Sequence, residues 1–318
     1  MAIAIAALVS QEPDLLRLFA AYHLTLGIDK IFLYFDYPLQ TLKLANSLPN
    51  SVECIPCSPQ FWLAQQTKRP ELLTGRIIAI RKDAIARARL LGIDALAFID
   101  SDEFLYSDAF FPDIITAHLK CFDAVCLLPC EAVHDTESLS GLPFSQRYFK
   151  VLPPLGSAHP VETLYPQLGV EISKDGFMGH RQGKSIISTD ARIPGLDRNH
   201  RPTLANGQPP SIVDDAILLH FDGIDFRSWQ NKWRKRLAGN GKKERLTPQR
   251  HRQIEQIEQA IAKGEEAERM LYESYFFLTH DRLAHGIALN AIRQPSRLGE
   301  LMTKARTLAR EFQVAGRL

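Results

Sequence analysis

The sequence predicts an α/β fold built on a mostly parallel, doubly wound sheet. Over the first 105 residues, apolar runs typical of strands alternate with helical patterns. Two of the predicted helices stop at a glycine, Gly27 or Gly92, shortly before the next strand. Strands and helices that alternate in this way form parallel sheets with right-handed crossovers. We therefore expect the first 105 residues to form a half-domain of the nucleotide-binding type.

The predicted elements follow one another closely in this region. Met1 to Val9 is apolar, too short to span a membrane and without the basic residues of a signal peptide, so we interpret it as a buried strand. Pro13 suits the first position of a helix. Apolar residues then recur at spacings of three and four: Leu15, Leu18, Phe19, Tyr22 and Leu26. The next predicted elements are strands at 30–35 and 51–56, a helix over 73–91 and a strand at 95–99.

The pattern is looser after Asp123. Strands are predicted at 124–128 and 147–152, separated by a polar stretch, and prolines keep the following segment irregular. Long loops of this kind beside a nucleotide site often form the pocket of a second substrate. After a strand at 217–221 the chain turns helical, and its apolar faces are expected mainly to pack in a core.

Composition describes a soluble globular protein. The chain has 318 residues, of which 45% are hydrophobic and 23% charged, and a net charge of +2. Five cysteines without regular spacing argue against a disulfide framework and favour the reducing cytoplasm. Cys54 and Cys57 have the C-x-x-C spacing, but no second pair accompanies them, so zinc is not expected.

One segment is strongly basic. Between Arg227 and Arg252 there are ten Lys or Arg residues and a single acid, Glu244. We predict that this segment faces an anionic surface, the inner leaflet of a membrane that carries a lipid-linked acceptor. The alternative is a solvated helix whose charges pair with acids elsewhere. Trp229 and Trp233 are four residues apart and share a helix face, so a nucleic-acid platform is not expected.

The most informative segment is an apolar strand that ends in three acids. Asp100 and Asp102 are two residues apart, so in extended backbone both side chains point to one side. Ser101 between them is small and lets the chain lie close to a ligand. Paired carboxylates suit Mg²⁺ or Mn²⁺, and such an ion leaves positions for phosphate oxygens. The pattern indicates a metal-bridged diphosphate; the alternative is an acidic turn that caps the next helix.

Three parts of the chain together resemble a known family. Val9–Glu12 and Ala20–Tyr34 are similar to a small-residue loop, a W-x-x-Y-H-x-x-x-G-V helix and a strand. Phe98–Leu105 is similar to a D-x-D-E-F metal motif, and the chain also has a G-K-S-I turn at 183–186 and an apolar strand with His220 at 219–221. These segments resemble the glycosyltransferase family 2-like group that includes family 92. Departures are Phe19-Ala20, where Trp is common, and Asp36-Tyr37-Pro38, where Asp-Asn is frequent.

The resemblance covers residues 3 to about 235 and implies a GT-A fold. In that fold a Rossmann-like, mostly parallel sheet binds a sugar nucleotide, and a mixed sheet continues it on the acceptor side. The expected domains are accordingly a GT-A glycosyltransferase domain over 1–235, with a nucleotide-binding half at 1–105 and an acceptor half at 106–235. A C-terminal helical extension would follow over 236–318.

The resemblance also implies a role for each matching residue around the nucleotide and the metal. Ser10, Gln11 and Glu12 would lie at the base, Asp36 at the base or ribose, Asp100 at the ribose or metal, Asp102 at the metal, Lys184 at the phosphates, and His220 at the metal or the diphosphate. Arg81, on the helix before the acidic strand, faces either a phosphate or solvent. Families of this group generally invert the anomeric centre by direct displacement, which needs one base. We expect that base in the loop that begins at Glu131 and contains Asp135, or at Asp175, and the alternatives stay open.

The sequence thus predicts a metal-dependent glycosyltransferase, using Mn²⁺ or Mg²⁺ and a UDP-sugar donor. The acceptor would be a saccharide or a lipid-linked molecule, as in polysaccharide biosynthesis. A nucleotidyltransferase is the alternative enzyme, but its glycine-rich, basic phosphate loop is not present at Ser10–Glu12. A non-catalytic carbohydrate- or nucleic-acid-binding protein is the alternative from another class.

Overall fold

The chain passes repeatedly between two compact units. The computed structural model describes residues 1–135, 142–152, 164–165, 176–191, 195–196, 202–205, 207–238 and 247–315. Unit 1 consists of Met1–Leu128, Gln182–Leu218 and Ser296–Leu318, and unit 2 of Pro129–Arg181 and Leu219–Pro295. Neither unit is a continuous stretch of the sequence, because each combines segments that are distant along the chain.

Unit 1 contains the mostly parallel sheet that the sequence predicts. Its strands are β1 (Ile3–Val9), β2 (Lys30–Phe35), β3 (Val52–Pro56), β4 (Ala95–Phe98), β6 (Ala124–Leu127), β9 (Lys184–Ser188) and β12 (Ser211–Ile212). Their order is β12-β6-β9-β4-β1-β2-β3. β1 pairs in parallel with β2 and β4, and β2 with β3, whereas β9 runs antiparallel between β4 and β6. The short strand β5 (Glu103–Ser107) follows β4, and β10 (Gly195–Leu196) pairs with β11 (Pro202–Thr203).

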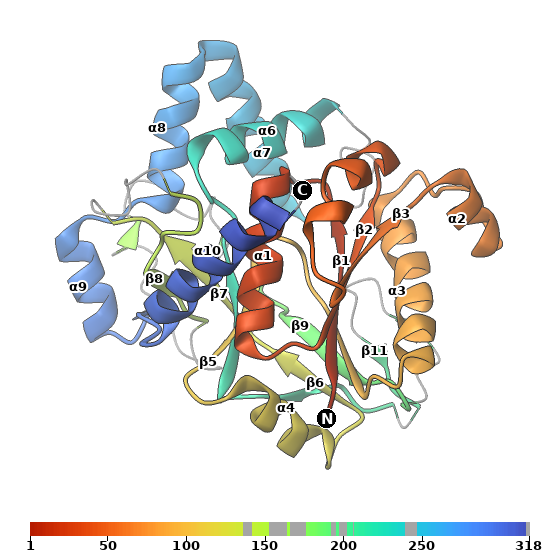
Figure 1. Cartoon of the computed structure of the whole chain (residues 1–318). Coiled ribbons are helices and arrows are strands. Elements are labelled where there is room, and N and C mark those ends of the chain that lie inside the picture. The colour runs from red at the N-terminus through yellow and green to blue at the C-terminus, as the bar shows by residue number, and fades with distance from the viewer. Residues whose placement is uncertain are drawn as a thin grey trace. The chain divides into compact units, whose positions relative to one another are not determined.

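Helices lie on both sides of this sheet, with α1 and α3 on opposite sides of β1 (Figure 1). The helices of unit 1 are α1 (Pro13–Leu26), α2 (Pro59–Ala64), α3 (Leu73–Leu90), α4 (Phe111–Leu119) and α10 (Leu298–Ala315), with 3-10 turns η1 (Pro38–Lys43) and η2 (Ala45–Ser47). Because successive strand residues point to opposite faces, Ala4 and Ala6 of β1 join a core cluster with Ile80 and Ala84 of α3. α10 returns from the far end of the chain to pack on α1.

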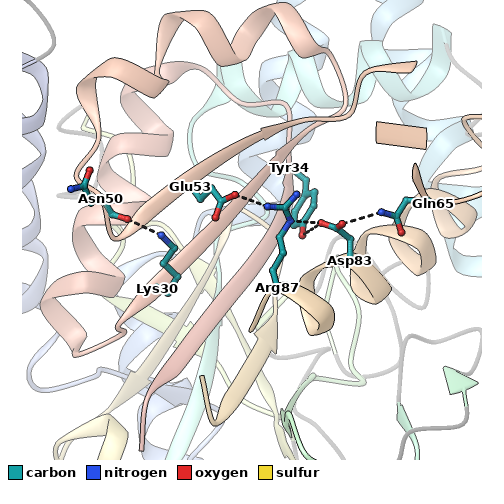
Figure 2. A network of polar contacts seen from close by, with 7 residues as sticks. All are labelled: Lys30, Tyr34, Asn50, Glu53, Gln65, Asp83 and Arg87. Carbon is teal, nitrogen blue, oxygen red and sulfur yellow. Dashed lines mark hydrogen bonds and ion pairs between the residues drawn. The ribbon is translucent and has the colours of Figure 1, made fainter. Parts of the chain in front are cut away.

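A polar network fixes α3 against β2 and β3 (Figure 2). The carboxylate of Asp83 accepts hydrogen bonds from the Tyr34 hydroxyl at 2.7 Å and the Gln65 amide at 2.9 Å. Arg87 pairs with Asp83 and with Glu53, both at 2.6 Å. Burial and the Asp83 charge both raise the pKa of Tyr34, which keeps it a neutral donor. α3 is therefore held at a defined height along the strands.

Helix α1 is tied to β5 through the backbone of Leu105. The Tyr22 hydroxyl donates to the Leu105 carbonyl at 3.0 Å, and Nε2 of His23 accepts from the Leu105 amide at 3.2 Å. Nδ1 of His23 lies 2.8 Å from the Phe19 carbonyl, so it carries the proton of a neutral ring. The His23 ring also stacks on Phe104, with centroids 5.4 Å apart. His23 is therefore a structural residue that links α1 to β5.

Unit 2 combines short antiparallel strands with a helical cluster. β7 (Pro129–Val133), β8 (Tyr148–Lys150) and β14 (Ile292–Arg293) pair in the order β7-β8-β14, and β13 (Ala216–His220) carries the chain from unit 1 into unit 2. The helices are α6 (Phe226–Ala238), α7 (Pro248–Lys263), α8 (Glu265–Phe276) and α9 (His280–Ala288). Their core is rich in aromatic residues and includes Trp229 and Trp233. Among the described helices, none combines the length and apolar character needed to cross a bilayer.

The buried state of His23 predicts a loss of stability in acid. Burial lowers the pKa of His23 to about 3, although the hydrogen bond to Phe19 opposes this. Because the unfolded chain then binds the extra proton, the free energy of unfolding falls as the pH drops below about 6.5, by about 2 kcal/mol at pH 5. Denaturant titrations at pH 7 and pH 5 measure this. His23→Gln should flatten the pH dependence, and the exposed His285→Gln should not; equal slopes for both variants would contradict the assignment.

Candidate functional site

The acidic motif lies in unit 1, in the turn between β4 and β5. The Asp100 amide donates to Oε2 of Glu103 at 2.7 Å, which closes the turn. The Lys184 ammonium lies 2.7 Å from Oδ2 of Asp100 and 3.2 Å from Oε2 of Glu103. Glu103 is fully buried, while the Asp100 side chain is about half exposed, at 51%. Ser101 and Asp102 occupy the same turn and are buried. The motif is thus an ordered cluster with one solvent-facing carboxylate.

The position of Lys184 follows from the topology of the sheet. Lys184 is the first residue of β9, which pairs antiparallel with both β4 and β6. The preceding Gly183 has φ +71°, and a Cβ there would lie 2.2 Å from the Leu127 carbonyl oxygen, so only glycine fits. Burial disfavours the Lys184 charge, but Asp100 and Glu103 hold its pKa above the usual range. The resemblance implies a phosphate role for Lys184; the structure places its ammonium against Asp100 and Glu103 of the acidic motif.

A second cation lies close to the motif. Arg81 of α3 is 4% exposed, and its guanidinium lies over the ring of Phe98 at 4.9 Å from the centroid. Its charge opposes protonation of Lys184, which indicates that the two groups share one electrostatic environment. Two cations beside one acidic turn suit a ligand that combines a metal ion with anionic oxygens.

The residues of the motif fit a hard divalent cation. A carboxylate oxygen of Asp100 and one of Glu103 lie within 4.8 Å of each other. The Lys184 ammonium already lies between these two carboxylates, so the site favours a positive charge. Oxygen donors of this kind suit Mg²⁺ or Mn²⁺.

The carboxyl ends of β1 and β2 border a small pocket in unit 1. It is lined by Gln11, Glu12, Pro13, Leu16, Phe35, Gln40 and Leu44. The Oε1 atoms of Gln11 and Gln40 are buried and have no hydrogen-bond partner among the described residues. Buried polar atoms are normally satisfied, so a ligand or water is expected to bind them. Ser10 beside the pocket is exposed, and Glu12 is the N-cap residue of α1.

Asp36, at the end of β2, is already bound by two arginines. Arg69 contacts both carboxylate oxygens, at 3.0 and 2.8 Å, and Arg76 lies 2.7 Å away. The resemblance implies a contact of Asp36 with a base or ribose, and the sequence does not indicate these two partners. Arg76 is on α3 and Arg69 lies shortly before it, so only the fold brings them to the end of β2.

In unit 2, His220 lies at the end of β13 and is buried, 5% exposed. A Cβ at Gly179 would lie 2.4 Å from its Cε1 atom, so the chain approaches His220 closely there. A nitrogen of His220 and a carboxylate oxygen of Asp222 lie within 4.8 Å. Asp222 is paired with Lys232 at 2.5 Å. Burial raises the pKa of Asp222, but Lys232, His220 and Arg250 together keep it well below its usual range. Sequence reasoning missed Asp222, although it lies only two residues after His220.

Glu131, one of the three base candidates, is fully buried in unit 2. Its carboxylate pairs with Lys150 at 2.6 Å. It also accepts hydrogen bonds from the backbone amides of Met178, at 2.9 Å, and Gly179, at 2.6 Å. Lys150 also donates to the Gly176 carbonyl at 2.6 Å. These contacts favour a positioning role, in which Glu131 holds the 176–179 segment against His220. Asp135 pairs with Arg147 at 2.8 Å, and Asp175 lies outside the described residues.

The basic segment is partly neutralised inside unit 2. Lys232 pairs with Asp222, and Arg234 pairs with Glu268 at 2.7 Å. Trp229 and Trp233 are 1% and 3% exposed, so their rings belong to the core. The tryptophans therefore add nothing to a membrane-facing surface.

Of the comparisons with known proteins, the one with solved structures finds matches. No protein-family model matches the sequence, and no curated protein matches it. Matching solved structures include HddC from Yersinia pseudotuberculosis, with 12% identity, a TM-score of 0.34, and coverage of 72% of this chain and 97% of that chain. A197 from STIV has 11% identity, a TM-score of 0.32, and coverage of 70% and 86%. The 4-diphosphocytidyl-2C-methyl-D-erythritol synthase from Anaerococcus prevotii DSM 20548 has 11% identity and a TM-score of 0.35, and the match covers 70% of this chain and 91% of that chain. The α/β assignment rests on the seven-stranded sheet of unit 1.

The buried pair of Glu131 and Lys150 predicts a test of the positioning role. Lys150→Met leaves the Glu131 carboxylate buried without its cation and should lower the free energy of unfolding by about 3–5 kcal/mol. Glu131→Gln in that background should recover part of the loss, because the buried charge is then removed. Denaturant titration measures both. The control is Lys304→Met, which breaks an exposed pair with Glu300 and should cost less than about 1 kcal/mol. Equal losses for Lys150→Met and Lys304→Met would contradict the assignment.

Proposed function

We propose that the protein is a metal-dependent glycosyltransferase with a GT-A arrangement that uses a nucleotide-sugar donor, a UDP-sugar. The observation that carries the proposal is the cluster at the carboxyl end of β4, where Asp100 and Glu103 enclose the Lys184 ammonium. Ligands of open α/β sheets bind outside the carboxyl ends of the strands. The resemblance of 98–105 to a D-x-D-E-F motif supports the same assignment.

The chemistry of such a transfer explains why acids and cations occur together. A nucleoside diphosphate leaves readily only when its developing negative charge is neutralised. A divalent cation held by Asp100 and Glu103, with Asp102 as the further ligand that the resemblance implies, would supply that neutralisation without a proton transfer. Lys184, and with it Arg81, would add positive charge toward the phosphates. His220 as a further ligand or diphosphate contact stays a prediction from the resemblance.

The pocket at the ends of β1 and β2 supports the assignment of the nucleoside. Gln11 and Gln40 offer buried amide oxygens that lack partners among the described residues. Such acceptors suit the donor groups of a pyrimidine base. Asp36 would contribute indirectly, because Arg69 and Arg76 hold it at this edge of the sheet.

Direct displacement would need a base near the acceptor hydroxyl. Glu131 is fully buried and engaged by Lys150 and two amides, so we favour Asp135, whose partner Arg147 is about half exposed, or Asp175 over Glu131 for that role. The acceptor is proposed to be a saccharide or a lipid-linked molecule.

Asp102→Asn tests the metal site. The amide keeps the shape but loses the charge that would hold the cation, so UDP affinity in the presence of Mn²⁺ should fall at least tenfold, about 1.4 kcal/mol. Isothermal titration of UDP with Mn²⁺ and with EDTA measures this. Asp113→Asn, at an exposed position of α4, is the matched control, and thermal unfolding verifies the fold. Undiminished metal-dependent binding in Asp102→Asn would overturn the assignment.

The same protein distinguishes the two transferase classes. With Mn²⁺, a glycosyltransferase releases UDP from a UDP-sugar, through transfer or slow hydrolysis. A nucleotidyltransferase instead releases pyrophosphate from UTP and a sugar phosphate. Phosphorus NMR separates the two products. Pyrophosphate release in place of UDP release would replace the proposed function with the alternative.

Lys184→Met tests the phosphate contact. Only UDP carries phosphates, so the variant should bind UDP at least tenfold more weakly and uridine within twofold of the parent protein. Lys184→Arg keeps the charge and should recover part of the UDP affinity. Competition titrations of both ligands give the comparison. A similar loss for uridine would indicate a folding defect and count against a phosphate role.

A further inference from the structure

Two arginines of unit 2 lie against one buried tryptophan. Arg236 is on the last turn of α6, and Arg250 is in the first turn of α7. Their guanidinium carbons lie 4.9 and 5.5 Å from the ring centroid of Trp233. Trp233 is 3% exposed and anchored in the core of unit 2, so it fixes the positions of both cations.

Two neighbouring cations of α6 already have partners. Lys232 pairs with Asp222, and Arg234 pairs with Glu268. Among the residues that the structure describes, neither Arg236 nor Arg250 has a carboxylate within ion-pair distance, 4.0 Å. Asp222 and Glu131 act on Arg250 only from further away. The group of Lys232, Arg236 and Arg250 therefore holds three cations and one paired carboxylate, Asp222.

The two arginines also repel each other. Burial lowers the pKa of Arg250 most, and the charge of Arg236 lowers it further. The N-terminus of α7, capped by Thr247, adds partial positive charge in the same turn. Like charges held together in a half-buried place are costly unless an anion joins them.

We propose that Arg236 and Arg250 bind a phosphate group in unit 2. Each guanidinium presents a planar fork of N–H donors, and a tetrahedral dianion has enough oxygens for both forks. A carboxylate has two oxygens and saturates with one fork. The phosphate belongs to a substrate, either the diphosphate of a nucleotide donor or the phosphate of a phosphorylated acceptor.

A compact site agrees better with the structure than a broad membrane surface does. Trp229 and Trp233 are buried and unavailable for insertion into lipid. Two of the neighbouring cations are neutralised by acids of the same unit. Arg236 and Arg250 differ from the exposed cations of this segment because both lie against one buried ring, which fixes their positions.

Pyrophosphate binding by the full chain tests this site without any metal. In EDTA and at constant ionic strength, the parent protein should bind pyrophosphate saturably in isothermal titration. Arg236→Gln and Arg250→Gln should each weaken binding at least tenfold, because each removes one fork. Arg252→Gln removes the same charge from an exposed position of α7 and should change affinity less than twofold. The pyrophosphate affinity of Arg250→Lys should lie between those of the parent protein and Arg250→Gln, because lysine keeps the charge and lacks the planar fork of donors.

The outcomes separate the possibilities. No saturable binding by the parent protein, or an equal loss in Arg252→Gln, would overturn the proposal. Binding to phosphatidylglycerol vesicles without binding of pyrophosphate would also overturn it, in favour of a membrane surface. If Arg250→Gln unfolds, Arg236→Gln at the helix end carries the test. Displacement of pyrophosphate by UDP would assign the phosphate to the donor, and simultaneous binding would assign it to another substrate. Because pyrophosphate binding is measured in EDTA, a failure of the metal site does not decide this test.

Discussion

Both backbone polar groups of Leu105 are bound by side chains of one helix, and the acidic motif depends on this contact. Tyr22 donates to the Leu105 carbonyl and His23 accepts from its amide. These two hydrogen bonds fix the position of β5 relative to α1. β5 begins at Glu103, the residue after Asp102 and the third after Asp100. The contact requires a neutral His23 with its proton on Nδ1, which the carbonyl of Phe19 and the surrounding aromatic rings enforce. A buried histidine thus anchors the turn that carries the carboxylates.

The acidic turn is also stabilised by a charge from a distant part of the chain. Glu103 is fully buried, and a buried carboxylate without a counter-ion would be strongly unfavourable. Lys184, 84 residues after Asp100, provides the counter-ion because β9 inserts antiparallel beside β4. The turn therefore keeps its shape without a ligand. A cation that joins Asp100 would share this carboxylate with Lys184, which stays the counter-ion of the buried Glu103.

Sequence periodicity was sufficient where local pattern decides structure. The apolar spacing of α1 and its end at Gly27, the strands β2 and β4, and the buried first strand were all predicted to within a few residues and are confirmed. Partner choice between distant segments could not be predicted. Nothing local indicates that β9 would reverse direction within a parallel sheet, that Arg69 and Arg76 would bind Asp36, or that α10 would return to pack on α1. The same limit explains why Glu131 looked like a loop base: its partner Lys150 comes from the neighbouring strand β8.

The basic segment shows why a count of charges is weaker evidence than their arrangement. Ten cations in twenty-six residues suggest a surface attracted to anions. In unit 2 some of these charges complete the fold, since Asp222 and Glu268 are buried acids that need Lys232 and Arg234. Both tryptophans are core residues, and two arginines cover the ring of Trp233, which is a common use of arginine on an aromatic face. Arg236 and Arg250 are the pair that the fold holds against one ring with no carboxylate among the described residues within ion-pair distance, and a pair of this size fits one phosphate group, as proposed above.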